Sequence, residues 1–132
     1  MNWRRHPDCP APGTRLCAWD DLPAEGGLER VFGASVDPLR LVVLRAGEVA
    51  VCFVNVCPHF SLPLNHEPGR FLTWDDAVVC AHHTAFFRLA DGVCTEGPCM
   101  GMALDQVPVM RQGSEVIFGD GAATGDSAGR AT

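Results

Sequence analysis

The sequence predicts an all-β protein made of small antiparallel sheets or a sandwich. Its 132 residues contain many short runs rich in β-branched residues, and turn residues such as Asp91-Gly92 and Gln112-Gly113 bound these runs. No segment keeps apolar residues three and four apart over the length that a helix requires. Several short strands at regular spacing, in one domain, are therefore the consistent interpretation.

The clearest local feature is a hairpin at residues 40–56. Two β-branched runs flank the segment "RAGE" at residues 45–48, in which Gly47 supplies the positive φ of a tight turn. Asp75-Asp76 is expected to be another turn, directly before a short apolar strand. The remaining strands are expected at residues 15–19, 28–33, 77–80, 85–89, 104–110 and 115–118.

Three segments are expected to lack regular structure. Residues 57–69 are loop-like because they contain prolines, an asparagine and a glycine, and residues 92–101 form a second irregular stretch. Residues 119–132 are small and polar, which is typical of a flexible tail. The sequence thus predicts a single domain over residues 1–118, followed by the tail.

Composition and charge exclude several classes of protein. Apolar residues make up 47% of the chain and charged residues 20%, as in ordinary globular proteins. The formal net charge is −6 and no basic run exceeds Arg4-Arg5, so nucleic acid is not an expected partner. The sequence shows neither a signal-peptide h-region nor an apolar stretch of about 18 residues, so we expect a cytoplasmic protein without a membrane anchor.

Two clusters of cysteine and histidine carry the chemistry: "CPH" at residues 57–59 and "CAHH" at residues 80–83. The chain has seven cysteines without the regular spacing of a secreted disulfide scaffold, which favours metal binding for some of them. Thiolates combined with imidazoles suit zinc or iron–sulfur chemistry, and suit magnesium or calcium poorly. The residues alone leave open whether His82 or His83 is the ligand of the second cluster.

Four ligands, two cysteines and two histidines, fit either of two sites. One is a structural zinc site; the other is a 2Fe-2S cluster with two thiolates on one iron and two imidazoles on the other. Zinc modules usually keep their cysteines together and their histidines together, whereas each cluster here mixes the two. The mixed spacing favours iron–sulfur chemistry, and a zinc-stabilised interaction module remains the alternative of another class.

These clusters resemble the signature of the Rieske family, C-x-H, a spacer, then C-x-x-H. The resemblance implies one 2Fe-2S cluster per chain, with Cys57 and Cys80 on one iron and His59 and His83 on the other. His82 would then be a spacer. The resemblance therefore turns the open choice between two adjacent histidines into a definite expectation.

The resemblance extends from residue 14 to about residue 118. The segment "RLCAWDDLP" is similar to the family's first strand and turn, and "AFFRLADGVCTEGPC" to the strand, turn and proline loop after the second ligand pair. This implies a Rieske-like β sandwich with a cluster-binding subdomain at about residues 56–101. Two ligand loops and the proline loop would form that subdomain.

The chain also departs from the family at the ligand loops. Glycines that commonly follow the ligand histidines are replaced by Ser61 and Thr84. High-potential members link the two loops by a disulfide, at places that match Leu62 and His82, and neither residue is cysteine. The resemblance therefore implies ligand loops without that bond.

A second departure concerns hydrogen bonds to the cluster. High-potential members donate them from a serine and a tyrosine, at places that match Ala85 and Phe87, and neither side chain has a hydroxyl. Such bonds stabilise the reduced state, so their loss predicts a low potential of roughly −150 mV. Backbone amides of the loops and of the Gly97-Pro98 stretch, in which only Gly97 has an N–H, are the expected donors instead, and Phe60, Leu62 and Pro98 are expected to cover the sulfur side.

The resemblance implies a Rieske-type ferredoxin, a one-electron carrier from a reductase to a terminal oxygenase-type enzyme. A small Rieske subunit of a larger oxidoreductase, such as nitrite reductase, is the second interpretation. Either way the protein is an electron-transfer component more than a stand-alone enzyme, with redox proteins as partners. No small-molecule substrate is expected, because four protein ligands leave no open coordination position.

The other cysteines are expected to be thiols without a metal. Cys52 alternates with Val51 and Phe53, which indicates a core position in a strand. Cys94 and Cys99 lie beside the proline loop, where two free thiols are favoured over a disulfide in a reducing compartment.

Overall fold

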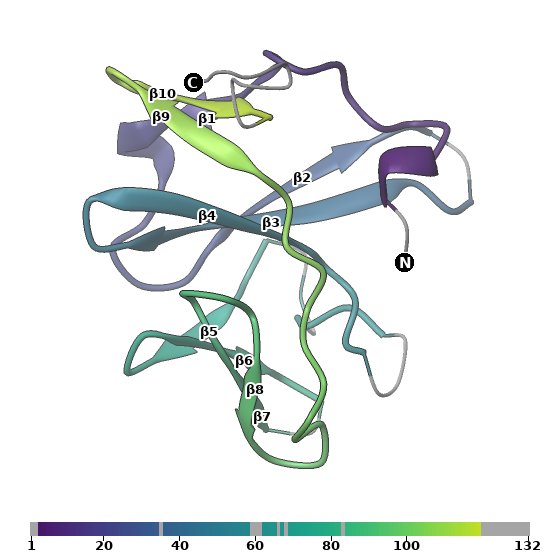
Figure 1. Ribbon diagram of the computed structural model, residues 1–132, viewed down its shortest axis with the longest axis vertical. Helices are drawn as coiled ribbons and strands as arrows, with labels where there is room; N and C mark the ends of the chain where they lie inside the picture. Colours follow the sequence, from purple (N-terminus) through teal and green to yellow (C-terminus); the bar gives the residue numbers. More distant parts are fainter. Residues whose placement is uncertain are drawn as a thin grey trace.

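The computed structural model describes residues 3–34, 36–58, 62–65, 67, 69–82 and 84–119. Within these residues the chain forms antiparallel sheets of three, three and four strands, and its helices are two single 3-10 turns. The sheets follow one another along the long axis in Figure 1, with β1-β10-β9 at one end and β5-β6-β7-β8 at the other. The predicted all-β class is confirmed. Among the described residues, no helix is long and apolar enough to cross a membrane.

The first sheet brings the two ends of the described chain together. Strand β1 (Arg15–Ala18) pairs with β10 (Glu115–Phe118), and β10 pairs with β9 (Val109–Gln112). The 3-10 turn η1 (Trp3–Arg5) packs on this sheet through an edge-to-face contact of Trp3 with Phe118, and η2 (Trp19–Asp21) follows β1 directly. The N-terminal segment thus covers the sheet that the last strands complete.

The middle sheet contains the predicted hairpin. Strand β2 (Leu28–Phe32) pairs with β3 (Leu39–Ala46), and β3 pairs with β4 (Val49–Val54). Gly47 lies in the β3–β4 turn with a φ of 67°, as the sequence predicts. The hairpin therefore forms the centre of the molecule (Figure 1).

Side chains of the β3–β4 hairpin enter two different cores because successive residues point to opposite faces. One face gives Val42, Leu44 and Phe53 to a cluster that we call the site-side core. The other face gives residues such as Leu41 and Val43 to a cluster that we call the base core. Burial on both faces explains why β3 has a continuous apolar run where a half-exposed strand would alternate.

The third sheet contains the strands that lead into the second ligand motif. It consists of β5 (Leu72–Trp74), β6 (Ala77–Cys80), β7 (Ala85–Arg88) and β8 (Cys94–Glu96). Asp75 and Asp76 join β5 to β6 with φ values of 50° and 59°, which confirms the expected turn. All four side chains of β6 are buried.

The predicted strands are confirmed to within about one residue at 15–19, 28–33, 77–80, 85–89 and 115–118. Strands β5 and β8 were not predicted, and β8 lies inside the stretch 92–101 that was expected to be irregular. The predicted strand at 104–110 is wrong in its bounds. Its first part pairs with β4 only through a single bridge, between Gln106 and Phe53. Strand β9 begins only at Val109, because Pro108 has no N–H for the hydrogen bonds of a sheet.

Candidate metal centre

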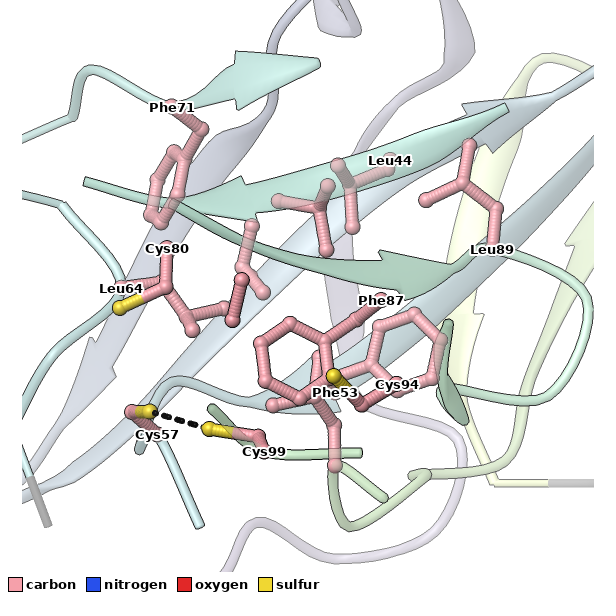
Figure 2. Close-up of a cluster of buried hydrophobic side chains, with 14 residues drawn as sticks. Leu44, Phe53, Cys57, Leu64, Phe71, Cys80, Phe87, Leu89, Cys94 and Cys99 are labelled. Carbon is pink, nitrogen blue, oxygen red and sulfur yellow. Dashed lines mark hydrogen bonds between the residues drawn. The ribbon is translucent and has the colours of Figure 1, made fainter. Parts of the chain in front are cut away.

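The two cysteines of the sequence motifs lie in the same core. Cys80 is the last residue of β6 and Cys57 follows shortly after β4, and both are fully buried. Both belong to the site-side core, and Figure 2 shows them at one edge of that core together with Cys99. The structure therefore brings together two thiols that are separated by the whole of β5 and β6.

The first ligand loop is closed by its own backbone. The Cys57 N–H donates a hydrogen bond of 2.7 Å to the carbonyl oxygen of Leu62. The Leu64 N–H donates to the side-chain oxygen of Asn55 at 2.8 Å, so a residue before the loop holds the residue after it. These two bonds return the chain to the core after the cysteine.

The second ligand loop is a tight turn that is tied to the first. The Thr84 N–H donates to the Cys80 carbonyl oxygen at 2.9 Å, and the Ala81 N–H donates to the Leu64 carbonyl oxygen at 2.8 Å. Thr84 has a φ of 57°, in the left-handed region that favours glycine. Glycine would meet no steric penalty at this position, and the chain accommodates threonine there.

A buried amide anchors the first loop, and the sequence analysis missed it. Asn55 is fully buried, and its Nδ2 donates to Asn65 Oδ1 at 2.9 Å and to Glu29 Oε2 at 3.1 Å. The other Glu29 oxygen accepts from the Gly69 N–H at 3.3 Å. The available signal was a polar residue between two valines, directly before the first motif.

The proline loop packs tightly on the start of β7. Gly97 has a φ of 102°, and a Cβ at this position would lie 2.8 Å from the Ala85 Cα. Beyond Gly97, the Met102 N–H donates to the Cys99 carbonyl oxygen at 2.9 Å. The Cys99 side chain is fully buried, and its Sγ lies 3.6 Å from Cys57 Sγ (Figure 2). Cys94 and Cys99 form no disulfide, as expected, and Cys99 in addition contacts Cys57, a proposed ligand.

The residues expected to cover the sulfur side lie at the surface where the structure describes them. Leu62 is 43% exposed, and Pro98 is exposed as well. The nearby Met100 and Met102 are also exposed, at 66% and 41%. Phe60 lies outside the described residues. The buried neighbours of the two cysteines are instead core residues such as Leu64 and Phe87.

The two positions that lack hydroxyls lie inside the site-side core. Ala85 and Phe87 are both fully buried on β7 and face the same core as Cys57 and Cys80. Neither can donate a side-chain hydrogen bond to sulfur. The two positions at which high-potential relatives were said to donate thus hold buried apolar side chains in this core.

The thiols of the base core differ from those of the metal centre in their surroundings. Burial is the main cause that raises the pKa of Cys52, and the nearby Cys17 contributes. Burial also raises the pKa of Cys17, against the opposing effect of Arg30. Both thiols therefore stay protonated and unreactive at neutral pH. The expectation that Cys52 is a core residue is confirmed.

The two histidines of the predicted ligand set, His59 and His83, lie outside the described residues. The described residues alone contain no group of three or more possible metal ligands. The donor set can therefore be tested only on its sulfur half. Two fully buried thiols at one edge of a core, on loops joined by a backbone bond, fit a cofactor that needs thiolate ligands.

The chain belongs to the Rieske [2Fe-2S] domain family, whose model matches residues 14–111. Its cofactor is accordingly a 2Fe-2S cluster, which favours the iron–sulfur prediction over the zinc alternative. The predicted extent of the resemblance, from residue 14 to about residue 118, agrees closely with the matched range.

Solved structures with a similar fold include several ferredoxins. The ferredoxin of carbazole 1,9a-dioxygenase from Nocardioides aromaticivorans IC177 is 24% identical, with a TM-score of 0.62 over 82% of this chain and 97% of that one. The Sphingomonas yanoikuyae B1 ferredoxin is 19% identical, with a TM-score of 0.62 over 80% and 96%. A third match, at 22% identity and a TM-score of 0.60 over 77% and 96%, is a complex of reduced oxygenase and oxidised ferredoxin in carbazole 1,9a-dioxygenase. No curated protein matches the chain.

Proposed function

We propose that this protein is a Rieske-type ferredoxin that carries single electrons from a reductase to a terminal oxygenase. The observation that carries the proposal is the placement of two fully buried thiols, Cys57 and Cys80, at one edge of the site-side core. The similar ferredoxins support it, because the chain covers nearly their whole length. One of the similar structures is itself a complex of an oxygenase with its ferredoxin.

We assign Cys57 and Cys80 to one iron of the cluster, and His59 and His83 to the other. The 2Fe-2S cluster supplies one-electron chemistry when it is bound. The side chains of Cys57 and Cys80 are shielded from water by the site-side core, and the Ala81 to Leu64 hydrogen bond keeps the two ligand loops together. The domain is proposed to span residues 1–118, with the cluster-binding subdomain at about residues 56–101.

The purified protein tests the proposal in two stages. Iron and acid-labile sulfide should each be close to two per chain, with the absorption and EPR spectra of a reduced 2Fe-2S cluster with mixed ligands. The reduced protein should then be mixed with a terminal oxygenase, and reoxidation of its spectrum followed by stopped flow. A colourless zinc protein without sulfide would exclude the carrier.

The alternative, a small Rieske subunit of a larger oxidoreductase such as nitrite reductase, predicts a different result. Such a subunit would elute with a large partner from the native host, whereas a carrier elutes alone. We also propose a cytoplasmic location, which the absence of a regular disulfide framework supports. Fractionation of the host cells would test it.

A further inference from the structure

A thiol from the proline loop lies against a proposed cluster ligand. Cys99 and Cys57 are 42 residues apart in sequence, and their sulfur atoms are 3.6 Å apart, within hydrogen-bonding reach for sulfur. Both side chains are fully buried, so water does not compete for this contact. The dashed line in Figure 2 marks the contact at the edge of the site-side core.

The backbone of the proline loop holds Cys99 in this position. Gly97 packs so closely on Ala85 that a Cβ would lie 2.8 Å from the Ala85 Cα, and the Met102 N–H donates to the Cys99 carbonyl oxygen. The loop is therefore attached to β7 on one side of Cys99 and turned back on the other. The Cys99 side chain is directed into the core.

The direction of the hydrogen bond follows from the proposed ligand assignment, on which this inference rests. Cys57 as a ligand is a thiolate, and a thiolate can only accept. Cys99 is not in the proposed ligand set, so it keeps its S–H and is the donor. We propose that Cys99 donates an S–H···S hydrogen bond to Cys57 and thereby raises the reduction potential of the cluster.

The apolar surroundings strengthen the effect of this bond. Leu64, Phe87 and Leu104 belong to the same buried cluster as the two cysteines. A hydrogen bond in a medium of low dielectric constant is electrostatically stronger than one in water. Reduction adds negative charge to the cluster and its sulfur ligands, so a donor to Cys57 stabilises the reduced state more than the oxidised state.

Cys99 therefore acts as a positioning residue that replaces, in part, the donors missing at Ala85 and Phe87. The chain offers a matched control in Cys94, which is also buried in the site-side core. The Cys94 Sγ donates instead to the Glu96 carbonyl oxygen at 3.2 Å. Removal of the Cys94 thiol thus removes a core sulfur without removing a donor to Cys57.

The test compares midpoint potentials of the intact protein and four variants by EPR-monitored redox titration. Cys99→Ala and Cys99→Val should shift the potential to more negative values; Val fills the space of the thiol if Ala destabilises the fold. Cys99→Ser should restore part of the shift, and Cys94→Ala should leave the potential unchanged. Resonance Raman spectra in H₂O and D₂O should show an isotope shift of the Fe–S bands that is smaller in Cys99→Val.

Two results would overturn the inference. The first is an unchanged potential in Cys99→Ala or Cys99→Val with full iron and sulfide content. The second is loss of the cluster in both of these variants when Cys94→Ala retains it, because Cys99 would then be a ligand. If the unaltered protein binds no 2Fe-2S cluster, the proposed function fails instead, so the two failures are distinguishable.

Discussion

The site-side core and the base core share the β3–β4 hairpin and are both mainly aliphatic and aromatic, but they differ in their cysteines. The base core is filled by aliphatic and aromatic side chains, and its buried thiols, Cys17 and Cys52, are kept protonated by desolvation. The site-side core contains four cysteines, and two of these are proposed ligands. Both faces of the hairpin thus stabilise the fold, and one of them also adjoins the candidate metal centre.

The two regions also differ in how they satisfy buried polar groups. The buried polar side chains among the described residues, Asn55 and Asn65, both flank the first ligand loop. In the base, regular strands pair their own backbone groups, whereas an irregular loop needs side-chain partners. A metal centre built from loops therefore requires polar anchors that a β sandwich alone does not.

The largest expected effect is loss of the cluster, and it should distinguish the two adjacent histidines of the second loop, His82 and His83. His83→Ala should abolish the 2Fe-2S absorption and EPR spectrum, because it removes one of four proposed ligands. His82→Ala should retain the cluster, because the proposed ligand assignment makes His82 a spacer. Iron and sulfide analysis of both variants checks the prediction, and loss of the cluster only in His82→Ala would reverse the assignment.

Truncations in the two cores should have similar effects on stability and different effects on the cofactor. Leu41→Ala in the base core should lower the free energy of unfolding by about 2–5 kcal/mol, and Phe87→Ala in the site-side core by about 3–5 kcal/mol. Only Phe87→Ala should also speed cluster loss below the unfolding transition. Chemical denaturation followed by circular dichroism measures the free energy of unfolding, and visible absorption measures the rate of cluster loss. Equal rates of cluster loss in the two folded variants would contradict the division between the cores.

Two glycines near the proline loop provide a smaller and sharper comparison. Gly97 and Gly101 have φ values of 102° and 91°, so alanine should cost about 1–3 kcal/mol at either position. A Cβ at Gly97 also meets the Ala85 backbone, whereas one at Gly101 meets nothing within 4 Å. Gly97→Ala should therefore lower the free energy of unfolding further and change the reduction potential. If Gly101→Ala changes the potential as much, close packing at Gly97 is not the cause.

The smallest effect on stability is expected at an exposed ion pair beside β7, between Arg88 and Asp91. A hydrogen bond from Arg88, followed by one from the Val93 N–H, holds the pKa of Asp91 below its usual value. The pair therefore adds stability at pH values above the ordinary aspartate pKa, and this is lost as the pH falls through the lowered pKa. Asp91→Asn should remove this small pH dependence and leave the spectrum unchanged. Because the Arg88–Asp91 pair is exposed, added salt should reduce the difference in melting temperature between the unaltered protein and Asp91→Asn. A difference that persists in high salt would contradict this.

Local patterns were enough to predict much of the fold. The β3–β4 hairpin, the Asp75-Asp76 turn and five other strands follow from residue types and turn chemistry within short windows of sequence. The short strands β5 and β8 were missed because three residues carry little periodic signal. The bounds of the predicted strand at 104–110 were wrong because Pro108 interrupts the run, so that regular pairing begins only at Val109.

The sequence by itself determined the all-β class and the family, and it led to the proposal of Cys57 and Cys80 as ligands, because strand periodicity and ligand spacing are local properties of the sequence. Only the tertiary structure decided that Asn55 anchors the first loop and that Cys99 reaches Cys57. Both contacts join residues whose distance depends on how separate segments pack against one another. Packing of side chains from distant segments, and not local preference, decides which groups surround the proposed ligands.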